Sequence, residues 1–399
     1  MVVKKYNMKK INSLKYNFVM NIILTMSSFI FPLITFPYIS RILMPQGTGK
    51  ISFVSSVVSY FALFAQLGIP TYGIRVCAKV RDDKEELTRT VQELLIINIV
   101  MSILAYMALF VAVMSIPRLQ QDKTLFFIVS STILFNAIGM EWLYKALEQY
   151  SYITVRSIIF KFIALLAMFI LVHQQSDYVL YGGISIFASS ASNIFNFIHA
   201  RKYVFFKPIG NYNIKRHFKA VMIFFAMSCA TTIYTNLDTV MLGFITSDID
   251  VGYYNAAVKI KNILVSVVTS LGVVLLPRAS YYVEHKMMRE FEHITQKAIN
   301  FVFLISVPLM VYSILFSKEC ILFLSGQAYE GAIIPMQIIM PTLLLIGLTN
   351  IMGIQILVPL GKEKMVLCSE IVGVIVDIIL NACFIPRFFS AGAAIGTLV

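Results

Sequence analysis

Long uninterrupted apolar runs are the feature that most limits what this chain can fold into. A bilayer core about 30 Å thick needs about 20 helical residues for each crossing, and eleven runs of about this length can be counted. They lie at residues 18–39, 49–70, 91–114, 124–144, 151–172, 178–199, 218–245, 252–277, 298–317, 331–358 and 364–386. Only 13% of the residues are charged, about half the share typical of soluble domains. The sequence therefore predicts an all-α polytopic membrane protein.

Two pairs of landmarks indicate an internal repeat. Gly47 and Gly252 are 205 residues apart, and the Leu-Gly pairs that begin at Leu67 and Leu271 are 204 residues apart. A nearly constant offset predicts two six-helix lobes. Since six is even, both lobes begin on the same side of the membrane, as parallel pseudo-repeats.

A twelfth apolar run begins at the segment AGAAIGTLV and reaches the end of the sequence, so we expect the twelfth helix to be incomplete. The longest polar stretch, residues 201–217, mixes aromatic and basic side chains, which suits a linker on the inner membrane surface. The predicted domains are an N-terminal lobe at 1–200, this cytoplasmic interfacial linker, and a C-terminal lobe at 218–399.

The net charge of +13 is distributed as membrane topology predicts. If the N-terminus is cytoplasmic, 24 of the 33 Lys and Arg residues fall in inner segments, six fall in outer segments, and Lys161, Lys259 and Lys261 lie within spans. An excess of Lys and Arg in cytoplasmic loops sets the orientation of inserted helices. We therefore expect a multi-pass protein in a lipid bilayer, with a cytoplasmic N-terminus and no nucleic-acid partner.

Motifs for catalysis, metal binding and nucleotide hydrolysis are missing from the sequence. The five cysteines show no CxxC spacing, the five histidines are dispersed, and there is no G-x-x-x-x-G-K-[ST] phosphate loop. The predicted outer loops are too short to hold a catalytic domain. We expect a transporter, with no enzymatic activity, cofactor or metal site, that draws energy from an ion gradient or the membrane potential.

Carboxylates within the predicted spans are candidates for carrying a coupled cation, because ionisable groups in a membrane are costly and usually functional. Glu370, Asp377 and Asn381 follow steps of seven and four, which places them on one face of the eleventh run. Asp238 lies in the seventh run. Asp377, Glu370 and Asp238 are therefore the predicted ion-coupling residues, with a buried structural pair as the alternative.

Two lysines interrupt the eighth run and point in different directions. A separation of two residues is about 200° around a helix. Lys259 shares a polar stripe with Asn255 and Asn262, whereas Lys261 has apolar helical neighbours. We expect Lys259 to face a cavity as an anion-attracting group and Lys261 to pack against a carboxylate or carbonyl group. A salt bridge from Asp238 to either lysine is the structural alternative.

The predicted substrate cavity therefore includes Lys259, Asn255 and Asn262 from the eighth run. Further polar groups complete this set: Lys161 in the fifth run, Asn196 on a polar stripe of the sixth, and Arg41 in the first outer segment.

Several segments spread over nearly the whole chain resemble one family. They are FPYISRILMPQGTGKISF, EWLYKALEQYSYITVRSIIFK, DTVMLGFITSDIDVGYYNAAVKIKNILVSVVTSLGVVLLPRASYY, and QILVPLGKEKM continuing to NACFIPRFFSAGAAIGTL. The chain is similar to the bacterial O-antigen and capsule repeat-unit flippases of the multidrug/oligosaccharidyl-lipid/polysaccharide exporter superfamily. The incomplete twelfth helix departs from the family pattern of 12 to 14 helices.

The resemblance implies two lobes around a central cavity in the bacterial inner membrane. It also implies alternating access, linked to protons or sodium, that turns an undecaprenyl-diphosphate-linked oligosaccharide from the inner to the outer leaflet. A polysaccharide polymerase is a candidate protein partner. The alternatives are a cation-coupled drug exporter of the same fold and, in another class, a membrane polysaccharide polymerase or ligase.

Overall fold

The computed structural model describes residues 14–399, and every regular element in this range is helical. The side chains of residues 14, 15, 271–274, 276, 277 and 363 are outside the description. Of the five N-terminal lysines used to predict the topology, Lys4, Lys5, Lys9 and Lys10 lie wholly outside the described residues, and the fifth is Lys15, whose side chain is among those just named.

The α-helices follow one another along the chain. They are α1 (Leu14–Gln66), α2 (Ile69–Lys79), α3 (Lys84–Ser115), α4 (Pro117–Gln120), α5 (Lys123–Gly139), α6 (Glu141–Ala146), α7 (Tyr150–Leu171), α8 (Tyr178–Ile186), α9 (Asn193–Ala200), α10 (Lys215–Ile245), α11 (Asp248–Glu284), α12 (Met288–Leu315), α13 (Ser317–Ser325), α14 (Ile333–Ile339), α15 (Thr342–Thr349) and α16 (Glu363–Leu398). Short 3₁₀-helices lie at η1 (Gln175–Asp177) and η3 (Gln327–Ala332), and π-helices at η2 (Phe187–Ala191) and η4 (Asn350–Leu357).

In the described part of the chain, seven helices are long and apolar enough to cross a membrane, or eight if the bent pair Gln327–Ile339 and Thr342–Leu357 is one span. Nine of the eleven predicted runs correspond to these helices, and the sixth and eighth runs are not among the helices counted. The first two runs lie in the single helix α1, the sixth is divided among α8, η2 and α9, and the eighth lies in α11.

Two helices change direction at residues with a positive φ. In α1 the change is at Met44 (φ 58°), immediately before Pro45. The ring of a proline disfavours helical backbone at the preceding residue. In α16 it is at Phe389 (φ 52°), three residues after Pro386. The segment after Phe389 folds back, because a Cβ on Gly392 would overlap the carbonyl oxygen of Phe384. Small residues allow this close approach.

The chain divides into two compact units. Unit 1 comprises the residues through Pro32, Phe61–Leu171 and Leu180–Ser228, and unit 2 comprises Leu33–Tyr60, Val172–Val179 and Cys229–Val399. The lobes expected at 1–200 and 218–399 remain a prediction.

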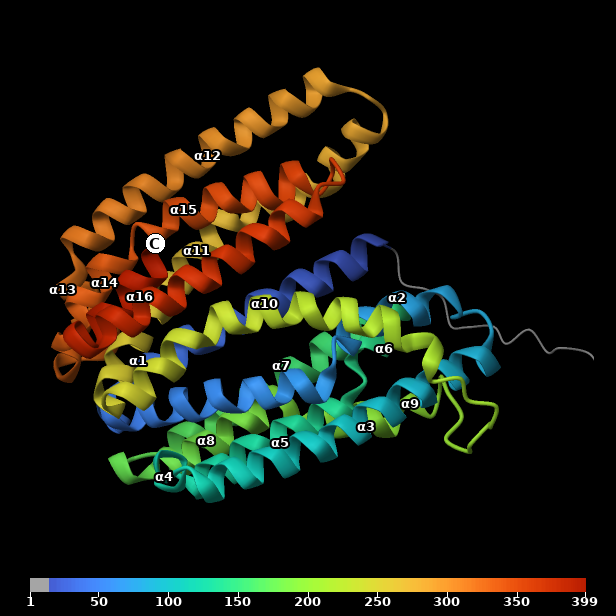
Figure 1. The fold of residues 1–399 in the computed structure, drawn as a ribbon, viewed down its shortest axis with the longest axis horizontal. Coiled ribbons are helices and arrows are strands. Elements are labelled where there is room, and N and C mark those ends of the chain that lie inside the picture. The colour runs from blue at the N-terminus through green and yellow to red at the C-terminus, as the bar shows by residue number, and fades with distance from the viewer. Residues whose placement is uncertain (1–13) are drawn as a thin grey trace, which may run out of the picture. The chain divides into compact units, whose positions relative to one another are not determined.

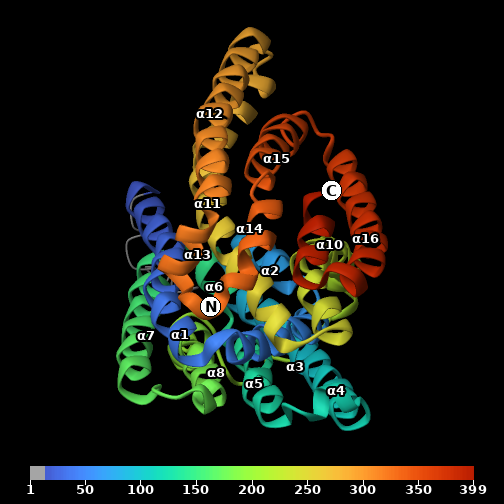
Figure 2. The same ribbon diagram turned by 90° about the vertical axis from the view of Figure 1, so that its left-hand side faces the viewer.

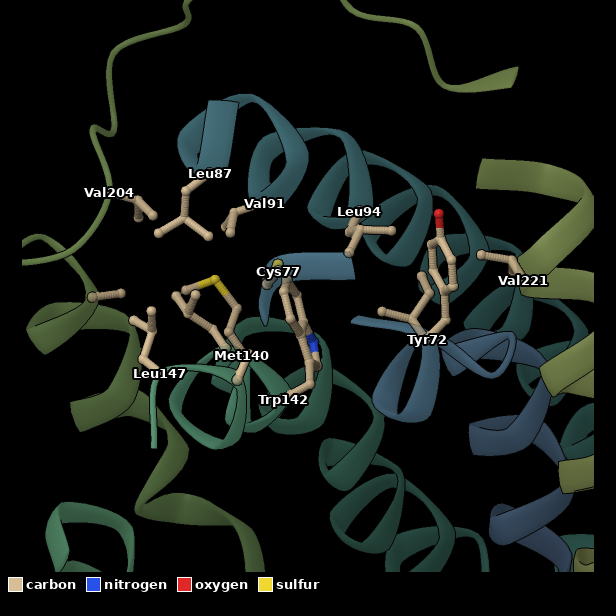
Figure 3. Close-up of a cluster of buried hydrophobic side chains, with 14 of the residues drawn as sticks. Tyr72, Cys77, Leu87, Val91, Leu94, Met140, Trp142, Leu147, Val204 and Val221 are labelled. Atoms are coloured by element: carbon tan, nitrogen blue, oxygen red, sulfur yellow. The ribbon is translucent and has the colours of Figure 1, made fainter. Parts of the chain in front are cut away.

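A buried apolar core holds unit 1 together (Figure 3). Cys77 of α2, Leu94 of α3 and Trp142 of α6 lie in it, together with Val204 near the start of the linker and Val221 just after its end. The linker predicted to lie at the membrane surface is therefore anchored to the helices of unit 1 at both ends.

In unit 2, α11 packs along α12 and also contacts α14 and α16 (Figures 1 and 2). The beginning of α11 also lies against the bend of α1. A Cβ on Gly49 would overlap the carbonyl oxygen of Asp248, and one on Gly252 would overlap that of Pro45. Only glycine permits this approach of two backbones.

Candidate functional site

A buried polar cluster in unit 2 joins three helices. Asp238 comes from α10, Tyr254 from α11, and Asp377, Asn381 and Thr397 come from α16 on the two sides of its bend at Phe389. We call these five residues the aspartate cluster. Asp238 and Asp377 are each 6% exposed and Asn381 is fully buried, so the cluster is withdrawn from solvent.

One amide nitrogen bridges the two carboxylates of the aspartate cluster. The Nδ2 of Asn381 donates to Oδ1 of Asp238 at 2.6 Å and to Oδ1 of Asp377 at 3.0 Å. The hydroxyl of Thr397 donates to Oδ2 of Asp238 at 2.6 Å, and the hydroxyl of Tyr254 donates to the same oxygen. The two hydroxyl groups are 2.8 Å apart. Asp238 therefore links all three helices.

Gly396 lies against the oxygens of this cluster, where a side chain would overlap them. A Cβ on Gly396 would lie 2.8 Å from Oδ1 of Asp377 and closer still to Oδ1 of Asn381. In the described part of the chain, this Asn381 oxygen is buried without a hydrogen-bond partner. Carboxylate, amide and hydroxyl oxygens are the ligands that hard cations prefer.

The aspartate cluster brings two acidic groups together without a paired base. Among the described residues neither carboxylate forms an ion pair, although the buried Lys261 interacts electrostatically with Asp238. Two close carboxylates cannot both stay ionised without a compensating cation. Among the described residues, no three His, Cys, Asp or Glu side chains gather into a group that could hold a metal ion.

The structure brings together two of the three predicted ion-coupling residues. Glu370 is exposed on α16, seven residues before Asp377, and does not belong to the cluster. Tyr254 and Thr397 were missed by the sequence prediction, because a hydroxyl within an apolar run is usually a packing feature. Only the fold-back of α16 places Thr397 beside Asp238, and no periodicity of the sequence indicates it.

Lys259 also lies in unit 2, where its ammonium group sits over the ring of Phe36, 4.1 Å from the centroid. It is half-buried and has no ion-pair partner among the described residues. Of its stripe, Asn255 is half-buried and bonds to the carbonyl of Val251 at 2.9 Å, whereas Asn262 is exposed. Lys261 is 8% exposed, so the two lysines do have different surroundings.

Arg41 is exposed in unit 2 and bonds to backbone. Its guanidinium donates to the carbonyl oxygens of Pro37 at 2.5 Å and of Phe323 at 2.6 Å. Phe323 lies in the last turn of α13, where carbonyls lack helical partners and a cation is favourable. This contact gives Arg41 a structural role in addition to any role in a substrate cavity.

Lys161 and Asn196 belong to unit 1. The Nζ of Lys161 donates to the hydroxyls of Ser27 and Ser28 at 2.9 and 3.0 Å. Asn196 is fully buried, and neither polar atom of its side chain has a hydrogen-bond partner in the described part of the chain. The buried Arg156, which the topology count places in an inner segment, donates to the carbonyl of Ser192, one turn before Asn196.

A second carboxylate cluster, in unit 1, was not predicted from the sequence. Glu93 of α3 is completely buried and accepts from the backbone N–H of Asn213 at 2.6 Å, from Nε of Arg216 at 2.9 Å and from Nε2 of His217 at 2.7 Å. The hydroxyl of Tyr72 lies 2.8 Å from Nδ1 of His217. We call these residues, with Glu86, the glutamate cluster.

The glutamate cluster fixes the end of the linker to α3. Arg216 also bonds to Glu86 at 2.7 Å. Directly before Glu93 in α3, Gln92 donates to the carbonyls of Phe205 and Lys207 at 2.9 Å each and accepts from the hydroxyl of Tyr212 at 2.8 Å. The predicted interfacial linker is thus held by specific hydrogen bonds.

Comparisons with known proteins agree with this architecture. A family model described as "Polysaccharide biosynthesis protein" matches residues 14–283, and one described as "MatE" matches residues 224–383. The chain is similar to a "Putative O-antigen transporter" of Escherichia coli (strain K12), with 24% identity over 392 residues that cover 97% of this chain and 93% of the relative.

Two solved structures share the fold. The lipid II flippase MurJ, in an inward closed conformation, superposes with a TM-score of 0.73 and 16% identity, covering 96% of this chain and 84% of that chain. An inward-facing multidrug resistance MATE family transporter of the MOP superfamily gives a TM-score of 0.67 at 14% identity, covering 95% and 94%. The chain is therefore an all-helical polytopic membrane protein with the fold of these transporters.

Proposed function

This chain belongs to the polysaccharide biosynthesis protein family of membrane transporters, and on that premise we propose that it is a flippase for lipid-linked oligosaccharides. Its substrate is an undecaprenyl-diphosphate-linked repeat unit that moves from the cytoplasmic to the outer leaflet for O-antigen or capsular polysaccharide assembly. The observation that carries this proposal is the end-to-end similarity to a putative O-antigen transporter, over 93% of that protein. The family is one of transporters and not of enzymes.

We propose an orientation with the N-terminus in the cytoplasm of a bacterial inner membrane. The excess of Lys and Arg in alternate segments supports it. Two six-helix lobes would enclose a central cavity, and the nearly constant offset between the landmark pairs Gly47 and Gly252 and Leu67 and Leu271 supports this repeat. The substrate then crosses by alternating access between the lobes.

The proposed substrate cavity holds cations for the diphosphate of the lipid carrier. Lys259 supports this role because it is half-buried, has no acidic partner among the described residues and rests on an aromatic face. Such a cation remains available to a phosphate anion. Further proposed cavity residues are Lys161, Arg41, Asn255, Asn262 and Asn196.

The aspartate cluster is the proposed coupling site for a proton or a sodium ion. Binding one positive charge there would relieve the repulsion between Asp238 and Asp377. Because Asp238 bonds to α11 and to the segment after the bend of α16, its charge state is linked to the packing of these helices. Occupancy of the site can therefore bias the transporter toward one conformation.

A cation-coupled drug exporter is the second candidate. The match of residues 224–383 to the MatE family and the shared fold with a multidrug transporter favour it. The MatE match covers less of the chain than the match to the polysaccharide biosynthesis family, which spans residues 14–283. A polymerase or ligase is contradicted by the membership of a transporter family.

Deletion of the gene tests the proposed function. Lipid-linked repeat units should accumulate facing the cytoplasm while surface polysaccharide disappears, and drug susceptibility should stay unchanged. A strain without a paralogue that keeps normal surface polysaccharide would refute the proposal. Increased drug susceptibility alone would favour the exporter.

A polysaccharide polymerase is the proposed protein partner, and cross-linking in intact cells would test it.

Replacement of Lys259 tests the cavity. Lys259→Met should reduce surface polysaccharide at normal protein abundance, because the cation over Phe36 is lost, whereas Lys259→Arg should retain most of it because Arg also binds phosphate. Full retention in Lys259→Met would remove this residue from the proposed site.

A further inference from the structure

An open pocket lies in unit 2 where α11 ends and α12 begins. Its volume is about 370 Å³, within the range of small-ligand pockets. The helices turn into one another through His285, Lys286 and Met287. The pocket is lined by Leu275, Arg278, Tyr282, Glu290, His293, Ile294, Lys297 and Ala298. We call it the hairpin pocket.

The lining of the hairpin pocket is divided between polar and apolar groups. Leu275, Ile294 and Ala298 form its apolar part, and Ala298 is also part of a buried core with Val268 and Val302. The remaining lining residues are charged or can donate a hydrogen bond. The pocket therefore fits a ligand that carries a charged group on a hydrocarbon chain.

Two cations of the hairpin pocket keep donors available. Arg278 donates from Nε to the hydroxyl of Tyr282 at 3.0 Å, which fixes its guanidinium beside that ring. In the part of the chain that the structure describes, the terminal nitrogens of Arg278 and the Nζ of Lys297 have no hydrogen-bond or ion-pair partner. Guanidinium and ammonium donors with no protein partner are groups that bind phosphate.

The depth of the hairpin pocket also points to lipid. Arg278 directly follows the apolar run 252–277, and Lys297 directly precedes the run 298–317. Both cations therefore stand at the ends of predicted membrane spans, where the phosphates of a bilayer lie, while Leu275 lies within the first of these runs, on the hydrocarbon side.

We propose that the hairpin pocket binds a lipid-borne phosphate group. Arg278 and Lys297 contact the phosphate oxygens, His293 adds a donor, and the apolar side chains contact the first part of the hydrocarbon chain. Glu290 is the one carboxylate of the lining and limits the positive charge of the site. Two sources share this chemistry, a bilayer phospholipid and an isoprenyl diphosphate, and only the second rests on the proposed function.

Calorimetric titration of the purified full-length chain in a nonionic detergent tests this proposal. The probes are dihexanoylphosphatidylglycerol, farnesyl diphosphate, zwitterionic dihexanoylphosphatidylcholine and inorganic phosphate. At least one of the first two should bind more tightly than the last two. Arg278→Gln and Lys297→Gln should each weaken that binding about tenfold, since each removes a charged hydrogen bond.

Two further variants distinguish a loss of binding from a loss of folding. Glu290→Gln should tighten the binding, because a negative charge beside the phosphate is removed, and no loss of folding can do this. Arg289→Gln is the matched control, because Arg289 is exposed on the same helix and does not line the pocket. It should leave the affinity unchanged within about twofold.

The outcomes decide between the sources and against the proposal. Tighter binding of phosphatidylglycerol identifies a bilayer phospholipid as the ligand, and tighter binding of farnesyl diphosphate identifies the carrier lipid. The proposal is overturned if Arg278→Gln binds both lipids as the unmodified chain does. It is also overturned if Arg289→Gln weakens binding as much as Arg278→Gln, because the effect would then be general surface charge.

Discussion

Glu93 in unit 1 and the pair Asp238 and Asp377 in unit 2 are all buried carboxylates, but their partners differ. Glu93 accepts hydrogen bonds from an arginine, a histidine and a backbone N–H. Asp238 and Asp377 accept from one shared amide, and Asp238 also from two hydroxyls. The first group is neutralised by the protein itself, whereas the second has neutral donors alone.

This difference separates a structural role from a functional one. A buried carboxylate with a complete set of charged donors is stable as it stands, and removing one partner leaves an unpaired charge. Two carboxylates that share an uncharged donor repel each other until a cation binds. The glutamate cluster should therefore support stability, and the aspartate cluster should support transport at some cost in stability.

The largest expected effect is loss of transport on changing the aspartate cluster. Asp377→Asn or Asp238→Asn should lower surface polysaccharide in a complemented deletion strain by roughly 100-fold, because a neutral amide neither takes up a proton nor balances the charge of a bound cation. Protein abundance and thermal stability in detergent should be equal or higher, since a buried like-charge pair is removed. Normal transport by both variants would contradict the proposal that this cluster couples a cation to transport.

In the glutamate cluster, by contrast, a substitution should lower stability and leave transport per folded molecule unchanged. Glu93→Gln should lower the free energy of unfolding of unit 1 by about 3 kcal/mol, because Arg216 and His217 lose their charged partner. Cys77 can report this opening, since it is buried in the core of unit 1. The labelling rate of Cys77 by a thiol reagent is measured after the other cysteines are replaced by serine, namely Cys229, Cys320, Cys368 and Cys383.

Transport per folded molecule is the second measurement for Glu93→Gln. It should be unchanged once abundance is corrected for. If transport falls while Cys77 remains protected, the carboxylate of Glu93 takes part in the transport cycle and the contrast between the clusters is wrong.

The close approach of Gly396 to the aspartate cluster provides a test that leaves every charge in place. Gly396→Ala would put a methyl group 2.8 Å from Oδ1 of Asp377. It should reduce the apparent affinity for the coupled cation about tenfold, measured from the Na⁺ and pH dependence of transport in vesicles. Gly373→Ala on the same helix is the control, because its Cβ would meet nothing within 4 Å. Equal activity of the two variants would mean that the positions of the oxygens beside Gly396 do not affect cation binding.

The smallest expected effect concerns the linker that the glutamate cluster holds. Gln92→Ala removes the hydrogen bonds to Phe205, Lys207 and Tyr212 and should destabilise the docked linker by about 1 kcal/mol. Faster hydrogen exchange confined to residues 205–213 is the expected result. Gln296→Ala, an exposed site on α12, should change nothing there. Faster exchange throughout unit 1 would instead show that Gln92 supports the whole unit.

Local spacing predicted only part of the candidate site. The step of four between Asp377 and Asn381 predicts that the two share a helix face, and the hydrogen bond between them confirms it. Asp238 was singled out because a carboxylate in an apolar run is unusual. Glu370 met the same criterion, yet it is exposed outside the cluster, because periodicity indicates a face and not what that face contacts.

The glutamate cluster shows the other limit of the sequence. Glu93 and His217 are 124 residues apart, and neither belongs to a recognisable spacing. His217 lies in the segment predicted to be a surface linker, yet the structure buries it beside Glu93 and Tyr72. A polar residue in a loop carries no signal of whether the loop is docked.

The sequence by itself determined the environment, the helical class and the family of this protein. Each of these follows from local composition or from motifs that stay together in the chain, because the bilayer requires long apolar helices whatever their later packing. The tertiary structure alone decided which buried charges are neutralised. That depends on contacts such as Thr397 with Asp238 and Arg216 with Glu93, which exist only after a helix bends back or a linker docks.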